Sequence, residues 1–475
     1  MNKENKPGRW IPGVGQSEQE QASGSTAEPD NRQTTGPAET NPEEAGREKN
    51  PARGKESKRW DFNQRCLVVE TEQDLELGSL STVMIELPEG RICIVGTDEV
   101  KKPELIVTER VFADSEPEAR DFYEKNGSGV DVKVGSDSLL VTGKSSPSVV
   151  SGRSGNIRTG NISGSGITIR GLGNIRTGNI SGSGIAIGGG QIGPSQSVPT
   201  KETQVVLRVP VAKNANNEGE KPESTYIIKT SSGDIRVEKG TGKYNISSNS
   251  GNVIIRACNI VDLSKIENAF GDIEVTGTTL GSSEIENAFG NIGVIGTTLG
   301  SSTITNGSGN IEVTGAKLNS CSIAGKTGNI EVIGAALDLS PITNEAGYIE
   351  VIGAKLNSCS IAGKTKNIAV VGTILNSCAI TNESGNIEVT DGIFIGENTG
   401  ENTVKTEAGG ILVKFDRDQG EIKVKASVGG YATEKLYFEG VENPNVYFEG
   451  VENPNGQTAS LILTTQDGEI KVISK

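Results

Sequence analysis

The segment GNIEVTGAKLNSCSIAGKT (residues 309–327) is followed directly by GNIEVIGAALDLSPITNEA (residues 328–346), and this repetition decides the fold. The Gly-Asn/Asp-Ile marker that opens each segment recurs every nineteen residues from Gly271 to Gly385, with Lys366 once in place of the glycine. Fixed self-similarity at this short period is the signature of a solenoid, in which each repeat stacks on its neighbours.

The apolar residues of the repeat show which side chains face inward. An isoleucine, a valine two residues later, a leucine and a second isoleucine recur at fixed positions, and residues two apart in a strand share a face. The four ladders are Ile273, Ile292, Ile311, Ile330, Ile349, Ile368 and Ile387; Val275, Val294, Val313, Val332, Val351, Val370 and Val389; Leu280, Leu299, Leu318, Leu337, Leu356 and Leu375; and Ile266, Ile285, Ile304, Ile323, Ile342, Ile361 and Ile380. We expect an all-β fold, a parallel and right-handed β-solenoid with two strands and two turns per coil.

The N-terminal part of the chain differs in composition. Residues 1–58 are polar and predict a disordered tail. Residues 59–143 predict short strands and one helix opened by a Ser115–Glu118 capping box, and we interpret them as the first coils of the solenoid. Residues 144–200 form a Gly/Ser/Asn-rich insertion that repeats GNIRTGNISGSGI at an offset of eighteen, which fits two further coils as well as a flexible segment.

The C-terminal part carries the repeats and their end. Solenoid repeats occupy residues 201–430, and C-terminal strands that act as a cap occupy residues 457–475. Between them, residues 431–456 contain a tandem decapeptide with YFEGVENPN twice, which we expect to form a protruding loop. We interpret it as a duplication that is tolerated at the surface. The alternative is an aromatic contact loop built from Tyr437, Phe438, Tyr447 and Phe448.

Composition excludes several classes of function. The chain has no histidine, so histidine-based catalytic triads, zinc sites and pH switches are excluded. Its net charge of −15 opposes nucleic-acid binding. The six cysteines form no CxxC pair, and no apolar stretch predicts a signal peptide or a membrane segment. We expect a cytoplasmic protein by default, with the cell surface, reached by a non-classical route, as the alternative.

The most regular outward feature is a row of glutamates, one per coil. It contains Glu274, Glu312, Glu331, Glu350 and Glu388, interrupted by Gly293 and Ala369. We interpret the row as a solvated face that keeps the sheet from pairing, with weak cation binding by its carboxylates as the alternative. The calcium-binding repeat GGxGxDxUx is absent, so we expect no dedicated metal site and no cofactor.

Asparagine and cysteine also recur in phase with the repeat. Asparagines follow the marker glycine at 291, 310, 329, 367 and 386, and others recur at the opposite corner at 268, 287, 306, 344 and 382. Both rows predict amides that hydrogen-bond turns and stacked neighbours. Cys321, Cys359 and Cys378 share one phase with serines, which predicts small buried thiols; a Cys359–Cys378 disulfide is geometrically conceivable.

Several motifs resemble one known family. The segments MIELPEGRICIVGTDE (84–99), VVLRVPVA (205–212) and SSGDIRVEKGTGKYNISSNSGNVII (231–255), followed by SGNIEV coils, are similar to the bacterial "putative adhesin" domain family of unknown function. The resemblance covers roughly residues 80–475. It implies an adhesin-like β-helix with short coils, and it assigns no site residues because the family has no agreed activity.

Function follows from what the outward positions carry. They are monotonous from coil to coil, with no cluster of Asp and Arg or Lys and no phosphate-binding loop, so we expect no enzyme and no catalytic residues. The leading hypothesis is an adhesin-like rod that binds a protein or a glycan. The alternatives are an intracellular scaffold that associates end to end and, with less support, a carbohydrate-active enzyme.

Overall fold

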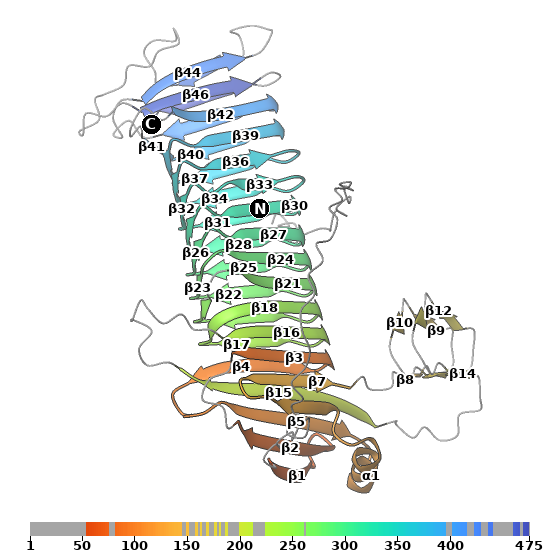
Figure 1. Cartoon of the computed structure of the whole chain (residues 1–475). Coiled ribbons are helices and arrows are strands. Elements are labelled where there is room, and N and C mark those ends of the chain that lie inside the picture. Colours follow the sequence, from red (N-terminus) through yellow and green to blue (C-terminus); the bar gives the residue numbers. More distant parts are fainter. Residues whose placement is uncertain are drawn as a thin grey trace, which may run out of the picture.

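A computed structural model gives the architecture. With side chains, the structure describes residues 54–75, 81–144, 199–211, 224–260, 263–395, 401–415, 461–465 and 469–473. It also describes the backbone of short strands between residues 149 and 188 and of the strands at 422–428, 436–439, 459–465 and 470–474. Parallel strands stack into one long rod, which confirms the predicted all-β solenoid (Figure 1).

From β18 to β41, the coils that the structure describes have three strands and three corners. One coil consists of β30 (Ser322–Thr327), β31 (Ile330–Ile333) and β32 (Ala336–Asp338). The expectation of two strands per coil was wrong, because the residues after the glycine corner are also extended. Gly334 turns the chain at φ 58°, and the segment that follows pairs in parallel with both neighbouring coils.

The three strands of successive coils build three faces. The groove face contains β16 (Thr225–Ser232), β18 (Thr241–Ser250), β21 (Ser264–Phe270), β24 (Ser283–Phe289), β27 (Thr303–Ser308), β30, β33 (Ile342–Asn344), β36 (Ser360–Gly363), β39 (Ala379–Ser384) and β42 (Glu401–Ala408). The glutamate face contains β17 (Ile235–Glu238), β19 (Val253–Arg256), β22 (Ile273–Thr276), β25 (Ile292–Ile295), β28 (Ile311–Thr314), β31, β34 (Ile349–Ile352), β37 (Ile368–Val371), β40 (Ile387–Thr390) and β43 (Ile411–Phe415). The third face contains β20 (Asn259–Ile260), β23 (Thr279–Leu280), β26 (Thr298–Gly300), β29 (Lys317–Asn319), β32, β35 (Lys355–Asn357), β38 (Ile374–Asn376) and β41 (Ile393–Ile395).

The interior of the rod is the set of predicted ladders. The isoleucines, valines and leucines of the four ladders are all buried, and each lies opposite its equivalent in the next coil, as Ile311 lies opposite Ile330. A single coil could not bury these side chains, whereas the stack buries them as one continuous core. The narrow interior explains how a chain with 33% hydrophobic residues and few aromatics folds.

Asparagines hold the corner between the groove face and the glutamate face. The Asn291 side-chain oxygen accepts the backbone N–H of Asn310, and Asn310 repeats the contact with Asn329 one coil later, at 3.0 and 3.1 Å. The second row lies inside the rod, where the amides of Asn268 and Asn287 donate to the carbonyls of Gly251 and Gly271. Both predicted asparagine rows are therefore structural.

The N-terminal region forms one coil and an antiparallel cap. β3 (Thr82–Glu89) and β4 (Arg91–Thr97) form the coil and pair in parallel with β16 and β17. The cap strands follow beyond them: β15 (Thr200–Pro210), β5 (Glu104–Phe112), β2 (Cys66–Asp74) and β1 (Lys55–Asp61) on one side, and β7 (Ser138–Gly143) and β6 (Val130–Val134) on the other. The interpretation of residues 59–143 as first coils thus holds only for β3 and β4. The cap strands β15 and β7 join this coil in parallel. All further pairings in the cap are antiparallel.

Two further expectations for the N-terminal region need correction. Strand β1 begins at Lys55, inside the predicted tail; residues 1–53 lie outside the described residues. Helix α1 (Glu116–Asn126) is confirmed, but the side chain of Ser115 makes no capping hydrogen bond. Glu116 instead pairs with Arg120, and the helix is held by burial of Ala119 and Tyr123 against β2 and β5.

The glycine-rich insertion forms short parallel strands. They are β8 (Val149–Ser151), β9 (Ile157–Thr159), β10 (Ile162–Ser163), β11 (Thr168–Arg170), β12 (Ile175–Thr177), β13 (Ile180–Ser181) and β14 (Ala186–Gly188). Ile157 lies opposite Ile175, and Ile162 lies opposite Ile180, at the offset of the sequence duplication. This pairing favours the interpretation of two extra coils. Their pairings are with one another and not with the two long sheets, among the strands that the structure describes.

The C-terminal coils are out of sequence order. Strands β44 (Ile422–Val428) and β45 (Leu436–Glu439) lie outermost, while β46 (Ala459–Thr465) and β47 (Ile470–Ser474) lie between them and the β42–β43 coil (Figure 1). The predicted loop over residues 431–456 is therefore wrong at Leu436–Glu439, which pairs with β47. Helix α1, at eleven residues, is too short to cross a bilayer, and no other helix occurs in the part of the chain that the structure describes.

Candidate functional site: the groove face

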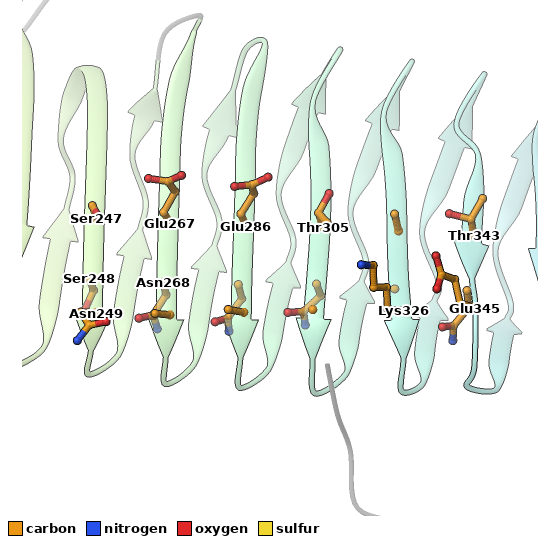
Figure 2. A pocket seen from close by; sticks show the side chains of 18 of the residues that line it. Ser247, Ser248, Asn249, Glu267, Asn268, Glu286, Thr305, Lys326, Thr343 and Glu345 are labelled. Atoms are coloured by element: carbon orange, nitrogen blue, oxygen red, sulfur yellow. The ribbon is translucent and has the colours of Figure 1, made fainter. Parts of the chain in front are cut away.

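A long groove crosses the strands of the groove face. Its volume is about 1240 Å³, and its lining extends from Glu86 on β3 to Glu407 on β42. Figure 2 shows the strands that it crosses, with the side chains of successive coils standing in columns. Because coils stack about 4.8 Å apart, an occupant of this groove would run along the rod and contact many coils in turn.

Small side chains form the floor of the central groove. One outward position carries Thr305, Ala324, Thr343, Ala362 and Thr381 in five successive coils. Threonine and alanine alternate here because the sequence has a second period of two coils. A floor of methyl and hydroxyl groups admits close approach and offers hydrogen bonds in every second coil.

A strip of alternating charge runs beside this floor. It consists of Lys326, Glu345, Lys364 and Glu383, which we call the charged strip; all four are exposed and line the groove. Backbone hydrogen bonds keep these coils in register, since the N–H of Glu345 donates to the carbonyl of Gly325 at 3.0 Å and that of Lys364 donates to Asn344 at 3.1 Å. The strip is neutral within a chain of net charge −15.

The end of the groove nearer the cap is acidic. Lys265 forms ion pairs with Glu267 at 2.8 Å, Glu284 at 3.2 Å and Glu286 at 3.7 Å. The hydrogen bond to Glu267 is the main cause that raises the pKa of Lys265, against the opposing effect of burial. Burial, with repulsion from Glu284, raises the pKa of the Glu286 carboxyl. One lysine thus pairs with three carboxylates, which leaves this end of the groove with a net negative charge.

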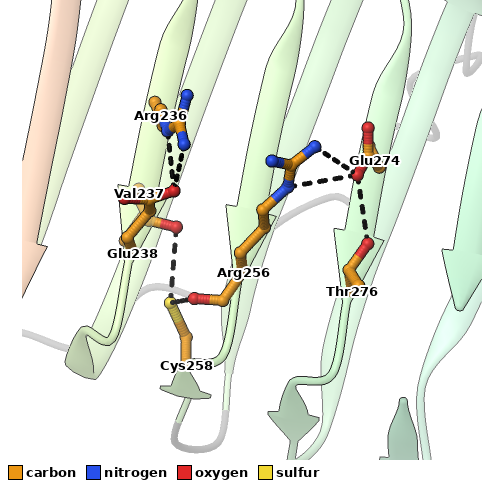
Figure 3. A network of polar contacts seen from close by, with 7 residues as sticks. All are labelled: Arg236, Val237, Glu238, Arg256, Cys258, Glu274 and Thr276. Carbon is orange, nitrogen blue, oxygen red and sulfur yellow. Dashed lines mark hydrogen bonds and ion pairs between the residues drawn. The ribbon is translucent and has the colours of Figure 1, made fainter. Parts of the chain in front are cut away.

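The predicted glutamate row exists but lies on a different face from the groove. Glu312, Glu331 and Glu350 occupy three adjacent strands in register on the glutamate face. Basic residues close the two ends of the row: Arg256 pairs with Glu274 at 2.8 Å, shown in Figure 3, and Lys414 pairs with Glu388 at 3.1 Å. In the described ranges no group of three or more His, Cys, Asp or Glu side chains could hold a metal ion.

The cysteines are free and carry no disulfide. Cys321, Cys359 and Cys378 are buried at one corner, and each thiol contacts backbone carbonyls, as Cys359 contacts those of Asn357 and Leu337 at 3.2 and 3.4 Å. Cys258 makes the equivalent contacts in an earlier coil (Figure 3). Burial raises the pKa of Cys258 and of Cys378 to about 11. These thiols are packing residues and poor nucleophiles.

The predicted aromatic contact loop is only partly visible. Tyr437 and Phe438 belong to β45, while their side chains, together with Tyr447 and Phe448, lie outside the described residues. The structure shows a different aromatic pair, Phe270 and Phe289, stacked with ring centroids 5.0 Å apart and 52% and 45% exposed. The sequence signal for this pair was the duplicated ENAFG at 267–271 and 286–290.

Sequence reasoning missed the groove as a whole. The glutamate row was the more regular sequence feature, whereas the charged strip repeats only every second coil. The near-identical AGKT at 324–327 and 362–365, with TNE at 343–345 and 381–383 between and after them, is the signal that could have found it.

Comparisons with known proteins find one family model and one solved structure that match this chain. Residues 174–338 match the family model described as Toastrack DUF4097. A solved structure described as a "putative cell adhesion protein" from Clostridium sporogenes ATCC 15579 matches at 10% sequence identity, covering 86% of this chain and 99% of that chain with a TM-score of 0.15. No curated protein matches the chain at a significant level. The expected resemblance is thus supported over residues 174–338, which are similar to the toastrack DUF4097 family.

Proposed function

We propose that this protein is a non-enzymatic, adhesin-like binding and scaffolding rod whose groove face receives an elongated partner. The observation that carries the proposal is the groove itself, about 1240 Å³ in volume and lined by residues from β3 to β42. A site that repeats along many coils offers many weak contacts to a long partner. Linked contacts of this kind strengthen binding without any single strong pocket.

The groups along the groove support binding better than catalysis. General acid–base chemistry needs carboxylates whose environments drive their pKa values apart beside a reacting bond. Here Glu267, Glu284 and Glu286 all pair with the single side chain of Lys265, which fixes them in place. The charged strip repeats the same two residue types, so no coil of the central groove is chemically distinct from the coil two positions away. A carbohydrate-active enzyme is the less favoured alternative.

A protein or a glycan fits the groove better than a nucleic acid. A net charge of −15 repels phosphate backbones, and the charged strip has as many glutamates as lysines. We place the rod in the cytoplasm, where buried free thiols such as those of this chain persist. Presentation at the cell surface is the alternative, and protease treatment of intact cells followed by detection of the N-terminal segment distinguishes the two.

A blocked groove tests the proposal. Ala324→Arg with Ala362→Arg places two bulky side chains on the groove floor, and Ala336→Arg places one on the exposed third face as the matched control. We expect wild type and the control to bind members of a printed array of linear glycans and surface-protein domains, and the double variant to lose that binding. Equal binding by all three proteins, or release of new reducing ends from any glycan, would contradict the proposal.

A further inference from the structure

The charged strip has a spacing that few ligands can match. Lys326, Glu345, Lys364 and Glu383 occupy the same position in four successive coils, so opposite charges stand about 4.8 Å apart and like charges about 9.6 Å apart along the rod. The spacing is fixed by backbone hydrogen bonds between coils, such as Ser384 N–H to the Lys364 carbonyl at 2.7 Å. A partner that pairs with all four charges must carry complementary charges at this same interval.

A second copy of this protein carries charges at the same interval, because its strip is identical. Read from the cap outward, the strip is Lys-Glu-Lys-Glu; read in the opposite direction, it is Glu-Lys-Glu-Lys. Two copies that meet groove face to groove face with their rods antiparallel therefore place Lys326 opposite Glu383 and Glu345 opposite Lys364 of the second copy. The pairing is reciprocal, as a two-fold interface requires.

We propose that the groove face binds a second copy of this chain, antiparallel, through the charged strip. The inference rests on the proposed function in one respect, that the groove face is a binding surface, and it names the partner. It differs from end-to-end association because it uses side chains on a face and leaves the backbone edges of both rod ends unused.

The groove floor suits this alignment. The two-fold axis would lie between the coils of Thr343 and Ala362, so Thr343 faces Ala362 and Ala324 faces Thr381 of the second copy. Threonine and alanine are small enough for two sheets to approach to about the 10 Å of ordinary sheet packing. Further out, Thr305 faces Lys405, and the acidic Glu286 faces Thr464, which lies in register with Lys405. No glutamate among these pairs meets another glutamate.

Parallel alignments of the two rods oppose like charges. Two parallel rods related by an axis along their length would place each coil beside its own equivalent, lysine near lysine and glutamate near glutamate. A parallel pair shifted by one coil matches most of the strip but sets Glu267 against Glu286. Like charges held opposite each other are strongly unfavourable at an interface, so the strip selects the antiparallel alignment.

The charge balance of the molecule favours the same face. Each copy carries −15, so most surfaces of two copies repel each other. The glutamate face bears Glu312, Glu331 and Glu350 in adjacent strands and would oppose an equivalent face. The charged strip is neutral, so two groove faces that meet at the strip repel each other less than two glutamate faces would.

Complementary charge variants give a direct test. Lys326→Glu with Lys364→Glu makes the strip all glutamate, and Glu345→Lys with Glu383→Lys makes it all lysine. We expect the wild type to dimerise in sedimentation-velocity and light-scattering measurements. For each double variant alone, the dissociation constant of the dimer should rise by about a hundredfold or more. An equimolar mixture of the two variants should form a 1:1 heterodimer.

The third face supplies the control. Lys317→Glu with Lys355→Glu makes the same change of charge on the third face, on β29 and β35, the strands that directly precede β30 and β36, and it should leave dimerisation unchanged. Circular dichroism and thermal melts establish that every variant is folded. A wild type that stays monomeric at all concentrations, or a mixture of folded double variants that does not associate, overturns the inference.

These outcomes separate the inference from the proposed function. Suppose that the wild type is monomeric and binds the array, and that the Ala324→Arg, Ala362→Arg double variant does not bind it. The groove then binds another partner, and self-pairing is wrong. If the charge variants behave as expected while the array shows no binding, self-pairing stands and an external glycan or protein partner is wrong.

Discussion

Ile92 of β4 lies directly opposite Ile235 of β17 in a parallel pair, although the chain passes through most of the cap and the glycine-rich insertion between them. The first coil therefore pairs with a coil that is distant in sequence. The other edge of β4 pairs with β15, so this strand joins the rod to its cap. The stability of the junction depends on how firmly the cap is built.

A buried ion pair should hold the cap together. Lys201 on β15 and Glu109 on β5 are 2.6 Å apart with only 8% and 3% of their side chains exposed, and Glu109 also accepts the backbone N–H of Gly129. Replacing Lys201 by Met leaves a buried carboxylate without its cation and should destabilise the cap by about 3–5 kcal/mol. Urea denaturation and hydrogen exchange of β5 would measure it. Exposed Lys125→Met is the control, and an equal effect from it would contradict the prediction.

Two glycines of one coil should respond differently to alanine. A Cβ on Gly347 would fall on the carbonyl oxygen of Gly328 in the preceding coil, so Gly347→Ala must force neighbouring coils apart. Gly353 turns the chain at φ 59° with open space around it, so Gly353→Ala costs only the left-handed conformation, about 1–2 kcal/mol. We expect a much larger loss of melting temperature for Gly347→Ala. Similar losses for the two variants would show that coil stacking tolerates the extra atom.

The internal thiols should resist alkylation. Burial raises the pKa of Cys258 and Cys378 to about 11, so at pH 8 few of these groups are thiolate and none is accessible. Iodoacetamide followed by mass spectrometry should label the half-buried Cys93 first and these two last, with all six labelled in denaturant. Native labelling of Cys258 or Cys378 at the denatured rate would contradict the packing described here.

Glu286 should make stability depend on pH. Its pKa in the folded protein is raised above the ordinary 4.5 by burial and by Glu284, so the folded state binds the proton more tightly than the unfolded state. Its contribution is favourable below pH 4.5 and is lost as pH rises through the folded pKa. Glu286→Gln should therefore have the melting temperature of the wild type near pH 4 and a slightly higher one at pH 7. The gain in free energy of unfolding at pH 7 should be less than about 1 kcal/mol. A variant less stable than wild type at pH 7 would contradict this sign.

The interior of the rod could be predicted because it depends on local periodicity. Ladders such as Ile311 to Ile330 repeat at a fixed interval, and inward-facing positions follow from alternation along a strand. The third strand of each coil was missed because it contains only one buried residue, for example Leu318 in Lys317–Asn319. One apolar residue gives no alternation for a sequence pattern to show.

The cap and the groove were less accessible to sequence reasoning for different reasons. The antiparallel pairing of β5 with β15 joins distant segments, and no periodicity relates Val107 to Val205, which lie opposite each other. The groove depends on which outward side chains are small, and alternation of Thr343 with Ala362 is a weak signal beside a row of glutamates. The glutamate row was correctly located, but regularity alone did not show that another face is hollowed.

The displaced C-terminal coil has a consequence for biosynthesis. Strands β44 and β45 dock on β46 and β47, which the ribosome makes later. At about 5–20 residues per second, some 2–7 seconds separate synthesis of Glu439 from that of Ser474. During that interval β44 and β45 have been made, but the two strands with which they pair in the folded rod have not. The end of the rod can therefore close only after translation of the later strands, in reverse of the order in which its coils emerge.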